Sequence, residues 1–372
     1  MKVLIVCNFS SGLYTFRAKL IQKLISDGNT VTAIVPQTSD AHELAAEEKL
    51  KSIGCTLCHL SMDRRSMNFV KDFGLFLGYL GVIREQKPDL IVTYTIKPNI
   101  YASLACQLIN LVRTKKINYA VNITGLGTAF ENEGLLKKLV CFLYKFALKN
   151  AKAVFFENTE NRRTMLELGL LKENQAVVLA GAGVDLEIFN LRPYPTDEET
   201  IRFLFIGRVM REKGVDELFE AMGRLVKKGV NCKLDVVGLF EEDYSEKLSQ
   251  YEKEGWLVYH GFQDDVRPFI ENCHCFVLPS WHEGMANTNL ECASVGRPVI
   301  TSSIPGCMEA VVEGESGLLC IPQNADSLFE KIESFSLLPY EERKKMGICG
   351  RKHMEKSFDK AMVVDMTVKN LY

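Results

Sequence analysis

The stretch FLFIGRVMREKG, residues 203–214, sets four large apolar residues before a glycine, a basic segment and a second glycine. A continuous apolar run of this kind is typical of a strand that is buried on both faces of a parallel sheet. Glycine lets the backbone approach a ligand closely, and Arg208 and Lys213 supply positive charge for an anion. The stretch therefore predicts a buried strand followed by an anion-binding loop, although two solvated charges in an exposed loop are the alternative.

Similar apolar runs recur along the whole chain and alternate with segments of helical periodicity. In the first half the predicted strands are 3–7, 31–35, 55–60, 90–95, 119–123, 153–156 and 177–179, with helices such as 14–25, 69–83 and 135–148 between them. In the second half the strands are 203–206, 233–237, 257–259, 275–278 and 298–301, followed by helices near 325–335 and 340–356. This alternation predicts two doubly wound α/β domains, each with a parallel sheet covered by helices on both faces.

The segment FNLRPYPTDEET, residues 189–200, contains two prolines and an acidic cluster, which are typical of a linker. We expect an N-terminal domain over 1–190 and a C-terminal domain over 191–355. We expect the last helix, 356–372, to pack back on the N-terminal domain.

The composition is that of an ordinary globular protein. Among 372 residues, 45 Lys and Arg oppose 47 Asp and Glu, giving a net charge of −2, which argues against a nucleic-acid binder. The longest apolar stretch, 73–83, is shorter than the roughly 20 residues of a membrane-spanning helix. The opening MKVLIVC is too brief for a signal peptide, so we expect a cytoplasmic protein whose 12 Cys are reduced.

A second motif, EGMANTNLE, carries Glu283 in a loop and Glu291 in the following helix. Eight helical residues span about 12 Å, whereas the two carboxyl groups of a glycosidase lie about 5–9.5 Å apart. The spacing therefore favours two carboxylates that bind different hydroxyl groups of one elongated ligand. Free amides at the helix start, those of Ala286, Asn287 and Thr288, favour an anion there. Taken alone, two such glutamates are more often solvated surface residues.

With these motifs the chain resembles GT-B-fold glycosyltransferases, specifically retaining family four, which use nucleotide sugars. The resemblance covers essentially the whole chain and includes the loop Ser10-Ser11-Gly12 after the first strand. It implies two Rossmann-like domains that face each other across a cleft. It also implies that Arg208 and Lys213 hold the donor diphosphate, that Glu283 contacts the donor sugar and that Glu291 binds the ribose.

Further donor-site residues are implied by the same resemblance. Gly12 would let the N-terminal domain close on the phosphates, and the loop around Gly261 and Phe262 resembles the one that holds a base, with UDP preferred by resemblance. The remaining donor-site positions are those between the two glutamates, namely Gly284, Met285, Ala286 and Asn287.

The family's reaction is a front-face substitution that retains configuration, in which the leaving phosphate helps to deprotonate the acceptor hydroxyl. Arg208 and Lys213 would stabilise the charge of the leaving diphosphate, so we expect no metal and no cofactor. Many relatives carry a His in the loop that here reads NITGLG, residues 122–127, but this chain has no His between His59 and His260. Thr124 is a positional candidate for that role.

The segments TIKPNIY, residues 95–101, and ITGLG, residues 123–127, resemble bacterial enzymes of capsule, O-antigen and N-glycan synthesis. Those enzymes extend saccharides on polyprenyl diphosphate, and some transfer N-acetylgalactosamine. Lys97, Asn99 and Thr124 are the acceptor-side candidates. Lys97 is expected either to contact an acceptor phosphate or to be a solvated loop lysine.

The segment LLKKLVCFLYKFALKN, residues 135–150, has four lysines, no acid and apolar residues at helical spacing. Such a helix binds an anionic membrane surface, which suits a lipid-linked acceptor and predicts a peripheral position on the cytoplasmic face. A packing helix with snorkelling lysines is the alternative.

Two other functions fit the same architecture. One is a UDP-sugar 2-epimerase, which requires groups that abstract a carbon-bound proton. The other is a non-catalytic protein that binds nucleotide sugars.

Overall fold

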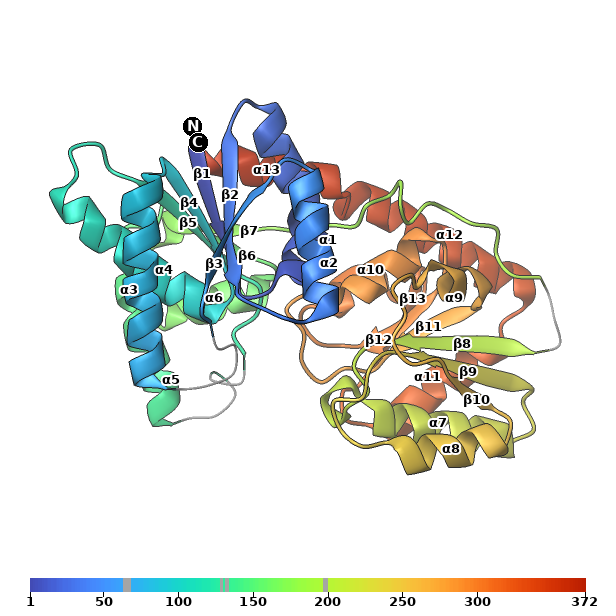
Figure 1. Cartoon of the computed structure of the whole chain (residues 1–372). Coiled ribbons are helices and arrows are strands. Elements are labelled where there is room, and N and C mark those ends of the chain that lie inside the picture. Colours follow the sequence, from blue (N-terminus) through green and yellow to red (C-terminus); the bar gives the residue numbers. More distant parts are fainter. Residues whose placement is uncertain (63–67, 128–129, 131–133, 197–199) are drawn as a thin grey trace. The chain divides into compact units, whose positions relative to one another are not determined.

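The computed structural model describes residues 1–62, 68–127, 130, 134–196 and 200–372. The chain forms two compact units (Figure 1), one made of Met1–Ala182 with Ala361–Tyr372 and the other of Gly183–Lys360. The first unit thus ends before residue 190, where the sequence places the boundary. The expected linker lies inside the second unit, because Arg192 N–H donates to the Val295 carbonyl at 3.2 Å and joins it to that unit.

The first unit is built on a parallel sheet of seven strands in the order β3-β2-β1-β4-β5-β6-β7. The strands are β1 (Lys2–Val6), β2 (Thr30–Pro36), β3 (Thr56–Leu60), β4 (Leu90–Tyr94), β5 (Asn118–Ile123), β6 (Ala153–Phe156) and β7 (Ala176–Val178). The order reverses between β1 and β4, so the loops after these two strands diverge to opposite sides.

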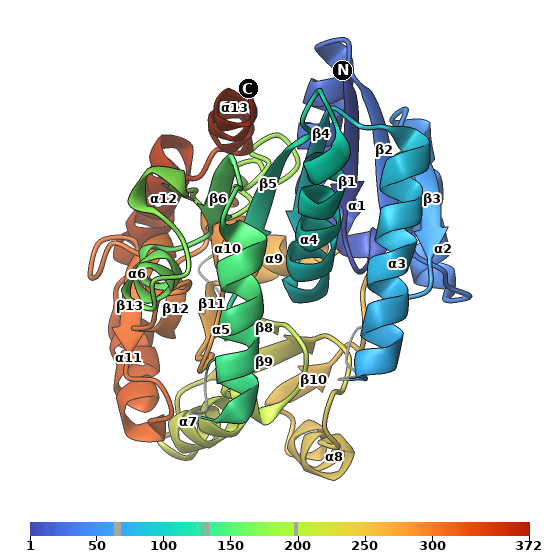
Figure 2. The same ribbon diagram turned by 90° about the vertical axis from the view of Figure 1, so that its left-hand side faces the viewer.

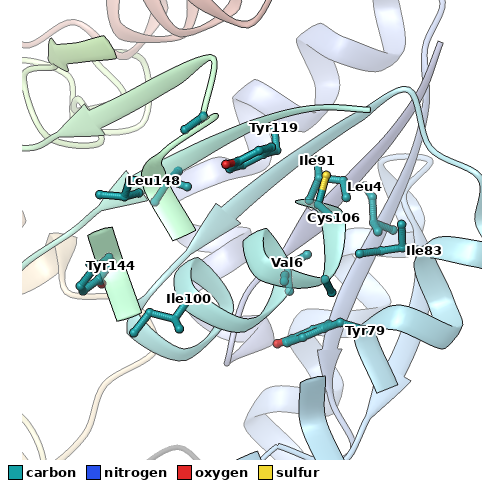
Figure 3. Close-up of a cluster of buried hydrophobic side chains, with 14 of the residues drawn as sticks. Leu4, Val6, Tyr79, Ile83, Ile91, Ile100, Cys106, Tyr119, Tyr144 and Leu148 are labelled. Carbon is teal, nitrogen blue, oxygen red and sulfur yellow. The ribbon is translucent and has the colours of Figure 1, made fainter. Parts of the chain in front are cut away.

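Helices cover both faces of this sheet because successive residues of a buried strand point to opposite sides. Leu4 and Val6 pack with residues of α3, α4 and α5, whereas Val3 and Ile5 pack with α1 and α13. Figure 3 shows the first cluster, and Figure 2 shows α3, α4 and α5 in one layer. The helices are α1 (Ser10–Ser26), α2 (Ala41–Ser52), α3 (Phe69–Gln86), α4 (Ile96–Val112), α5 (Leu135–Leu148), α6 (Thr159–Glu167) and α13 (Lys360–Leu371).

The second unit repeats the scheme with a parallel sheet of six strands in the order β10-β9-β8-β11-β12-β13. The strands are β8 (Ile201–Ile206), β9 (Cys232–Val237), β10 (Leu257–Tyr259), β11 (Cys275–Leu278), β12 (Val299–Ser302) and β13 (Gly317–Cys320). The prediction of two doubly wound parallel sheets is confirmed. Strand β13 was not predicted.

The helices of the second unit are α7 (Val215–Lys227), α8 (Ser245–Lys253), α9 (Arg267–Asn272), α10 (Asn287–Ser294), α11 (Ala325–Leu337) and α12 (Tyr340–Ser357). α7 turns an apolar stripe inward that includes Val215, Leu218 and Met222, each fully buried. The strand order reverses between β8 and β11. Ligands of open parallel sheets bind beyond the strand ends at this reversal, so the loops after β8 and β11 mark the candidate site.

Candidate functional site

Lys213 and Glu283 meet at the reversal in the second sheet. Lys213 ends a single 3-10 turn (Arg211–Lys213) after β8, and Glu283 lies in the loop after β11, the strand that pairs with β8. The Lys213 ammonium donates to Glu283 Oε1, and the two side chains are only 17% and 13% exposed. Two residues that the sequence assigns to one ligand thus form a largely buried ion pair.

Backbone contacts hold the two loops against each other. Trp281 N–H donates to the Glu212 carbonyl at 2.9 Å. Gly214 has φ +73°, and a Cβ at this position would lie 2.1 Å from the Pro279 carbonyl oxygen. Only glycine combines this backbone conformation with so close an approach, which explains the second glycine of the basic motif.

A third loop, after β12, completes this arrangement through Gly306. Its φ is +87°, and a Cβ there would lie 2.6 Å from the Glu283 carbonyl oxygen. The Ala286 N–H donates to the Gly306 carbonyl at 2.7 Å. The expectation that the Ala286 amide is free for an anion is therefore wrong, because this bond uses it.

The other donor-site candidates of the glutamate motif directly follow Glu283 in the sequence. Asn287 begins α10, and the side chains of Met285 and Ala286 are buried. The side chains of Met285 and Ala286 therefore pack into the second unit and are not presented to solvent.

Glu291 lies in α10, as predicted, and is half-buried. Burial raises the pKa of its carboxyl to about 7, and the positive charge of Lys360 opposes that shift. A carboxyl with this pKa changes charge near neutral pH, so its ability to accept hydrogen bonds depends on pH there.

Arg208 is placed differently from Lys213. It is half-exposed, and its guanidinium lies 3.6 Å from the carboxylate of Glu241, which follows β9. A pair this exposed is weak and opens readily. Arg208 therefore remains available to an anionic ligand but is not part of the Lys213–Glu283 pair.

The ends of β8, β9 and β10 meet through three glycines. Gly238 N–H donates to the Gly261 carbonyl at 2.8 Å, and a Cβ on Gly238 would lie 1.8 Å from the Gly207 carbonyl oxygen. Phe262, directly after Gly261, is 47% exposed. The loop implied to hold a base thus presents an exposed aromatic ring at the edge of the same sheet.

In the first unit, the expected loop of Ser10, Ser11 and Gly12 is the first turn of α1. The Glu43 carboxylate of α2 accepts the Ser10 N–H at 2.6 Å and the Ser11 N–H at 3.0 Å. A carboxylate is favourable at these N–H groups because the helix leaves them unpaired. The loop prediction for Gly12 is wrong because Glu43 stabilises a helix that starts earlier.

The acceptor-side candidates also lie in or beside a helix, since α4 begins at Ile96. Lys97 lies 2.8 Å from Asp72, to which the Tyr101 hydroxyl donates at 3.1 Å. Lys97 is therefore not a solvated loop lysine. Asn99 is 1% exposed and donates to the Asn122 carbonyl at 2.8 Å, so it points into the core.

Thr124 follows β5 and is half-buried. It remains a candidate by position only.

Helix α5 has features of both predicted kinds of helix, the packing helix and the membrane-binding helix. Val140 and Tyr144 are buried against the first unit's core, as in a packing helix. Phe142 and Phe146 are 58% and 49% exposed, with ring centroids 4.8 Å apart, and Lys145 is exposed beside them. The outer face of α5 is therefore apolar and basic. Among the described residues, no helix has the length and hydropathy to cross a bilayer.

Comparisons with known proteins agree with this architecture. The model of glycosyl transferase 4-like domains matches residues 2–158, and that of glycosyl transferases group 1 matches residues 188–353. The chain is 28% identical to N,N'-diacetylbacillosaminyl-diphospho-undecaprenol alpha-1,3-N-acetylgalactosaminyltransferase of Campylobacter jejuni, over 94% of this chain and 92% of the relative. It is 26% identical to the capsular polysaccharide biosynthesis glycosyltransferase CapM of Staphylococcus aureus, over 87% of each.

Among solved structures, Anabaena HepE in complex with UDP and glucose superimposes with a TM-score of 0.78. The sequence identity is 15%, and the match covers 100% of this chain and 99% of HepE. At this identity the likeness concerns the fold. The two adjacent domain matches, the full-length relatives and the two parallel sheets lead to one conclusion. The chain belongs to the glycosyltransferases, as an enzyme of GT-B fold with a glycosyl transferase 4-like first half and a group 1 second half.

Proposed function

We propose that this enzyme transfers a sugar from a UDP-sugar to a saccharide linked to a polyprenyl diphosphate, with retention of configuration. The observation that carries the proposal is the Lys213–Glu283 pair at the reversal of the second sheet. A nucleotide sugar offers a diphosphate for the ammonium and, next to it, sugar hydroxyls for the carboxylate. One ligand thus supplies an anion for the ammonium and hydrogen-bond donors for the carboxylate.

Each charged residue then has a role in the transfer step. The bond between the anomeric carbon and the diphosphate oxygen breaks while the acceptor oxygen bonds to the same face of that carbon. The acceptor proton passes to the departing diphosphate. Lys213, joined by Arg208 when its exposed pair with Glu241 opens, stabilises the negative charge that develops. These cations supply what a metal ion supplies elsewhere, so transfer should persist in a chelator.

Glu283 binds hydroxyls of the donor sugar, and Glu291 binds the ribose. The exposed ring of Phe262 offers a surface on which a base can stack. UDP is the proposed nucleotide, in line with the UDP that HepE holds in the same fold.

The acceptor is proposed from the relatives and from α5. The C. jejuni relative is named for an undecaprenol diphosphate-linked substrate and for the transfer of N-acetylgalactosamine. The exposed apolar and basic face of α5 fits an anionic membrane surface, where such a substrate resides.

We expect the enzyme to bind vesicles that contain phosphatidylglycerol. The double variant F142S/F146S should bind the same vesicles at least 5-fold more weakly. Equal binding by both proteins would reject this surface.

The experiment that tests the proposal is replacement of Glu283 by Gln, which keeps the size of the side chain and removes its charge. Transfer from a UDP-N-acetylhexosamine to a polyprenyl diphosphate-linked sugar should fall more than 100-fold. UDP binding, measured by calorimetry, should stay within about 3-fold. The matched control is Glu220→Gln, an exposed glutamate of α7. Unchanged transfer by E283Q would reject the role of Glu283.

The same assay separates the alternatives. An epimerase would convert the UDP-sugar without any acceptor, and a non-catalytic binder would form no product. The anomeric coupling constant of the product by NMR reports whether configuration is retained.

A further inference from the structure

Ser280 lies in the loop that carries Glu283, where that loop contacts the loop that carries Lys213, and its side chain is fully buried. Its Oγ lies 3.2 Å from the Glu212 carbonyl oxygen and 3.2 Å from the His282 carbonyl oxygen. Those carbonyls belong to the peptide groups that directly precede Lys213 and Glu283. One hydroxyl proton is thus shared between the two peptides that lead into the ion pair.

The residues on either side of Ser280 hold its loop firmly against the Lys213 loop. Pro279, the preceding residue, lies against Gly214, and the following residue, Trp281, donates its N–H to the same Glu212 carbonyl. The Trp281 indole N–H also donates to Glu217 of α7 at 3.2 Å. The loops therefore stay together without the Ser280 hydroxyl. That hydroxyl has a narrower effect, which is to orient the peptides at Glu212 and His282 relative to each other.

We propose that Ser280 is a positioning residue for sugar transfer. Its hydroxyl fixes the position of the Lys213 ammonium relative to the Glu283 carboxylate, and so affects the transfer step more than donor binding. This inference rests on the proposed roles of Lys213 and Glu283. Small displacements at a reacting centre cost large factors in rate because stabilising groups must lie where charge develops. A bound nucleotide keeps its other proposed contacts, since Glu291 and Phe262 lie on other segments and Arg208 lies five residues before Lys213.

The test compares Ser280→Ala with Ser294→Ala. Ser294 is also fully buried in the second unit, and its Oγ has no hydrogen-bond partner within the described ranges. For S280A we expect kcat to fall 10- to 100-fold while KM for the donor changes less than 3-fold. UDP should still bind with a stoichiometry of one, which shows that the lost rate does not reflect unfolded enzyme. S294A should keep kcat within 2-fold.

A double-variant comparison distinguishes a positioning role of Ser280 from a general structural role, because only the positioning role acts through Lys213. In a K213A background, with a radiolabelled donor to follow slow turnover, adding S280A should lower the residual rate less than 2-fold. A structural role predicts the same factor in both backgrounds. If S280A is insoluble, S280C carries the same comparison, because the thiol fills the space of the hydroxyl, although it is somewhat larger, and is a weaker hydrogen-bond donor.

The proposal is overturned if S280A or S280C transfers sugar as fast as the wild type, or if the loss lies in KM instead of kcat. E283Q, assayed in parallel, keeps the outcomes distinct. If E283Q is inactive while S280A is normal, the proposed function stands and only the role of Ser280 fails. If wild-type enzyme shows no transfer, the proposed function fails first.

Discussion

The Lys213 ammonium and the Glu283 carboxylate form a largely buried ion pair although 70 positions separate them in the sequence. The strand order brings them together, because β8 and β11 pair at the point where the sheet reverses. Each charge keeps the other compensated inside the protein. A ligand that offers an anion to the ammonium and hydroxyl groups to the carboxylate can hydrogen-bond both partners at once.

The pair predicts a specific pattern of stability. Removing one partner leaves a buried charge, so K213M and E283L should each lower the free energy of unfolding by about 3 kcal/mol. The double variant K213M/E283L should recover most of that loss but no transfer activity. Urea denaturation measures the four proteins, and K247M, which breaks an exposed pair with Asp216, should cost less than about 1 kcal/mol. A double variant as unstable as the sum of the singles would contradict this account.

Glu291 predicts a pH dependence. Its pKa is raised to about 7 in the folded protein, from an unfolded value near 4.5, so the folded state binds the proton more tightly. Its contribution to stability is therefore greatest below pH 4.5 and falls by up to about 3 kcal/mol as the pH rises to 7. E291Q should remove that slope.

Ligand binding should show the opposite trend, because the ionised carboxylate is the better hydrogen-bond acceptor for a ribose. Uridine, which lacks a phosphate that titrates nearby, should bind the wild type more tightly at pH 8 than at pH 6. Calorimetry should show no such difference for E291Q. A wild-type affinity that does not change with pH would argue against contact between Glu291 and the ribose.

Much of the fold could be predicted because buried parallel strands are continuous apolar runs. The predicted bounds of β6 and β11 are those of the structure. β13 was missed because its four residues begin with a glycine and follow a polar turn. Gly317 is needed there, since a Cβ would lie 2.1 Å from the Val299 carbonyl oxygen of the neighbouring strand. That contact is not visible in the sequence.

The starts of α1 and α4 could not be predicted for a related reason. Ser-Ser-Gly is a poor helix-forming sequence, and α1 begins there because Glu43, distant in sequence, accepts its first N–H groups. α4 carries Pro98 in its first turn, where proline is tolerated because that N–H has no partner in the helix. The helical turn then directs Asn99 into the core instead of toward a ligand.

For the candidate site, the residue types could be predicted from the sequence, whereas the residues that they contact could be identified only from the structure. The prediction that Glu291 lies in the helix after the 275–278 strand is confirmed. The contacts of Lys213 with Glu283, and of Ser280 with the Glu212 carbonyl, depend on which strands are neighbours. Local spacing carries no information about that order.

Arg297 predicts a large loss of stability when its guanidinium is replaced. It is fully buried, and its guanidinium donates to the carbonyls of Ile270 at 2.9 Å, Glu271 at 2.9 Å and Pro193 at 2.8 Å. R297K cannot span the same carbonyls, because an ammonium is compact, so it should lower the free energy of unfolding by about 3 kcal/mol or more. R267K, at an exposed pair with Asp265, should change it by less than about 0.5 kcal/mol. Equal unfolding midpoints in urea would show that the carbonyl contacts contribute little.

Glu43 predicts how the start of α1 is stabilised. Its carboxylate, on α2, accepts the Ser10 N–H at 2.6 Å and the Ser11 N–H at 3.0 Å, whereas the N-cap residue of α1 makes no side-chain hydrogen bond. E43A should lower the free energy of unfolding by about 1 kcal/mol, since those N–H groups lose their acceptor. E48A, which removes an exposed glutamate of α2, should change the free energy of unfolding by less than about 0.5 kcal/mol. Equal unfolding midpoints of E43A and E48A in urea would show that the Glu43 carboxylate contributes little to the start of α1.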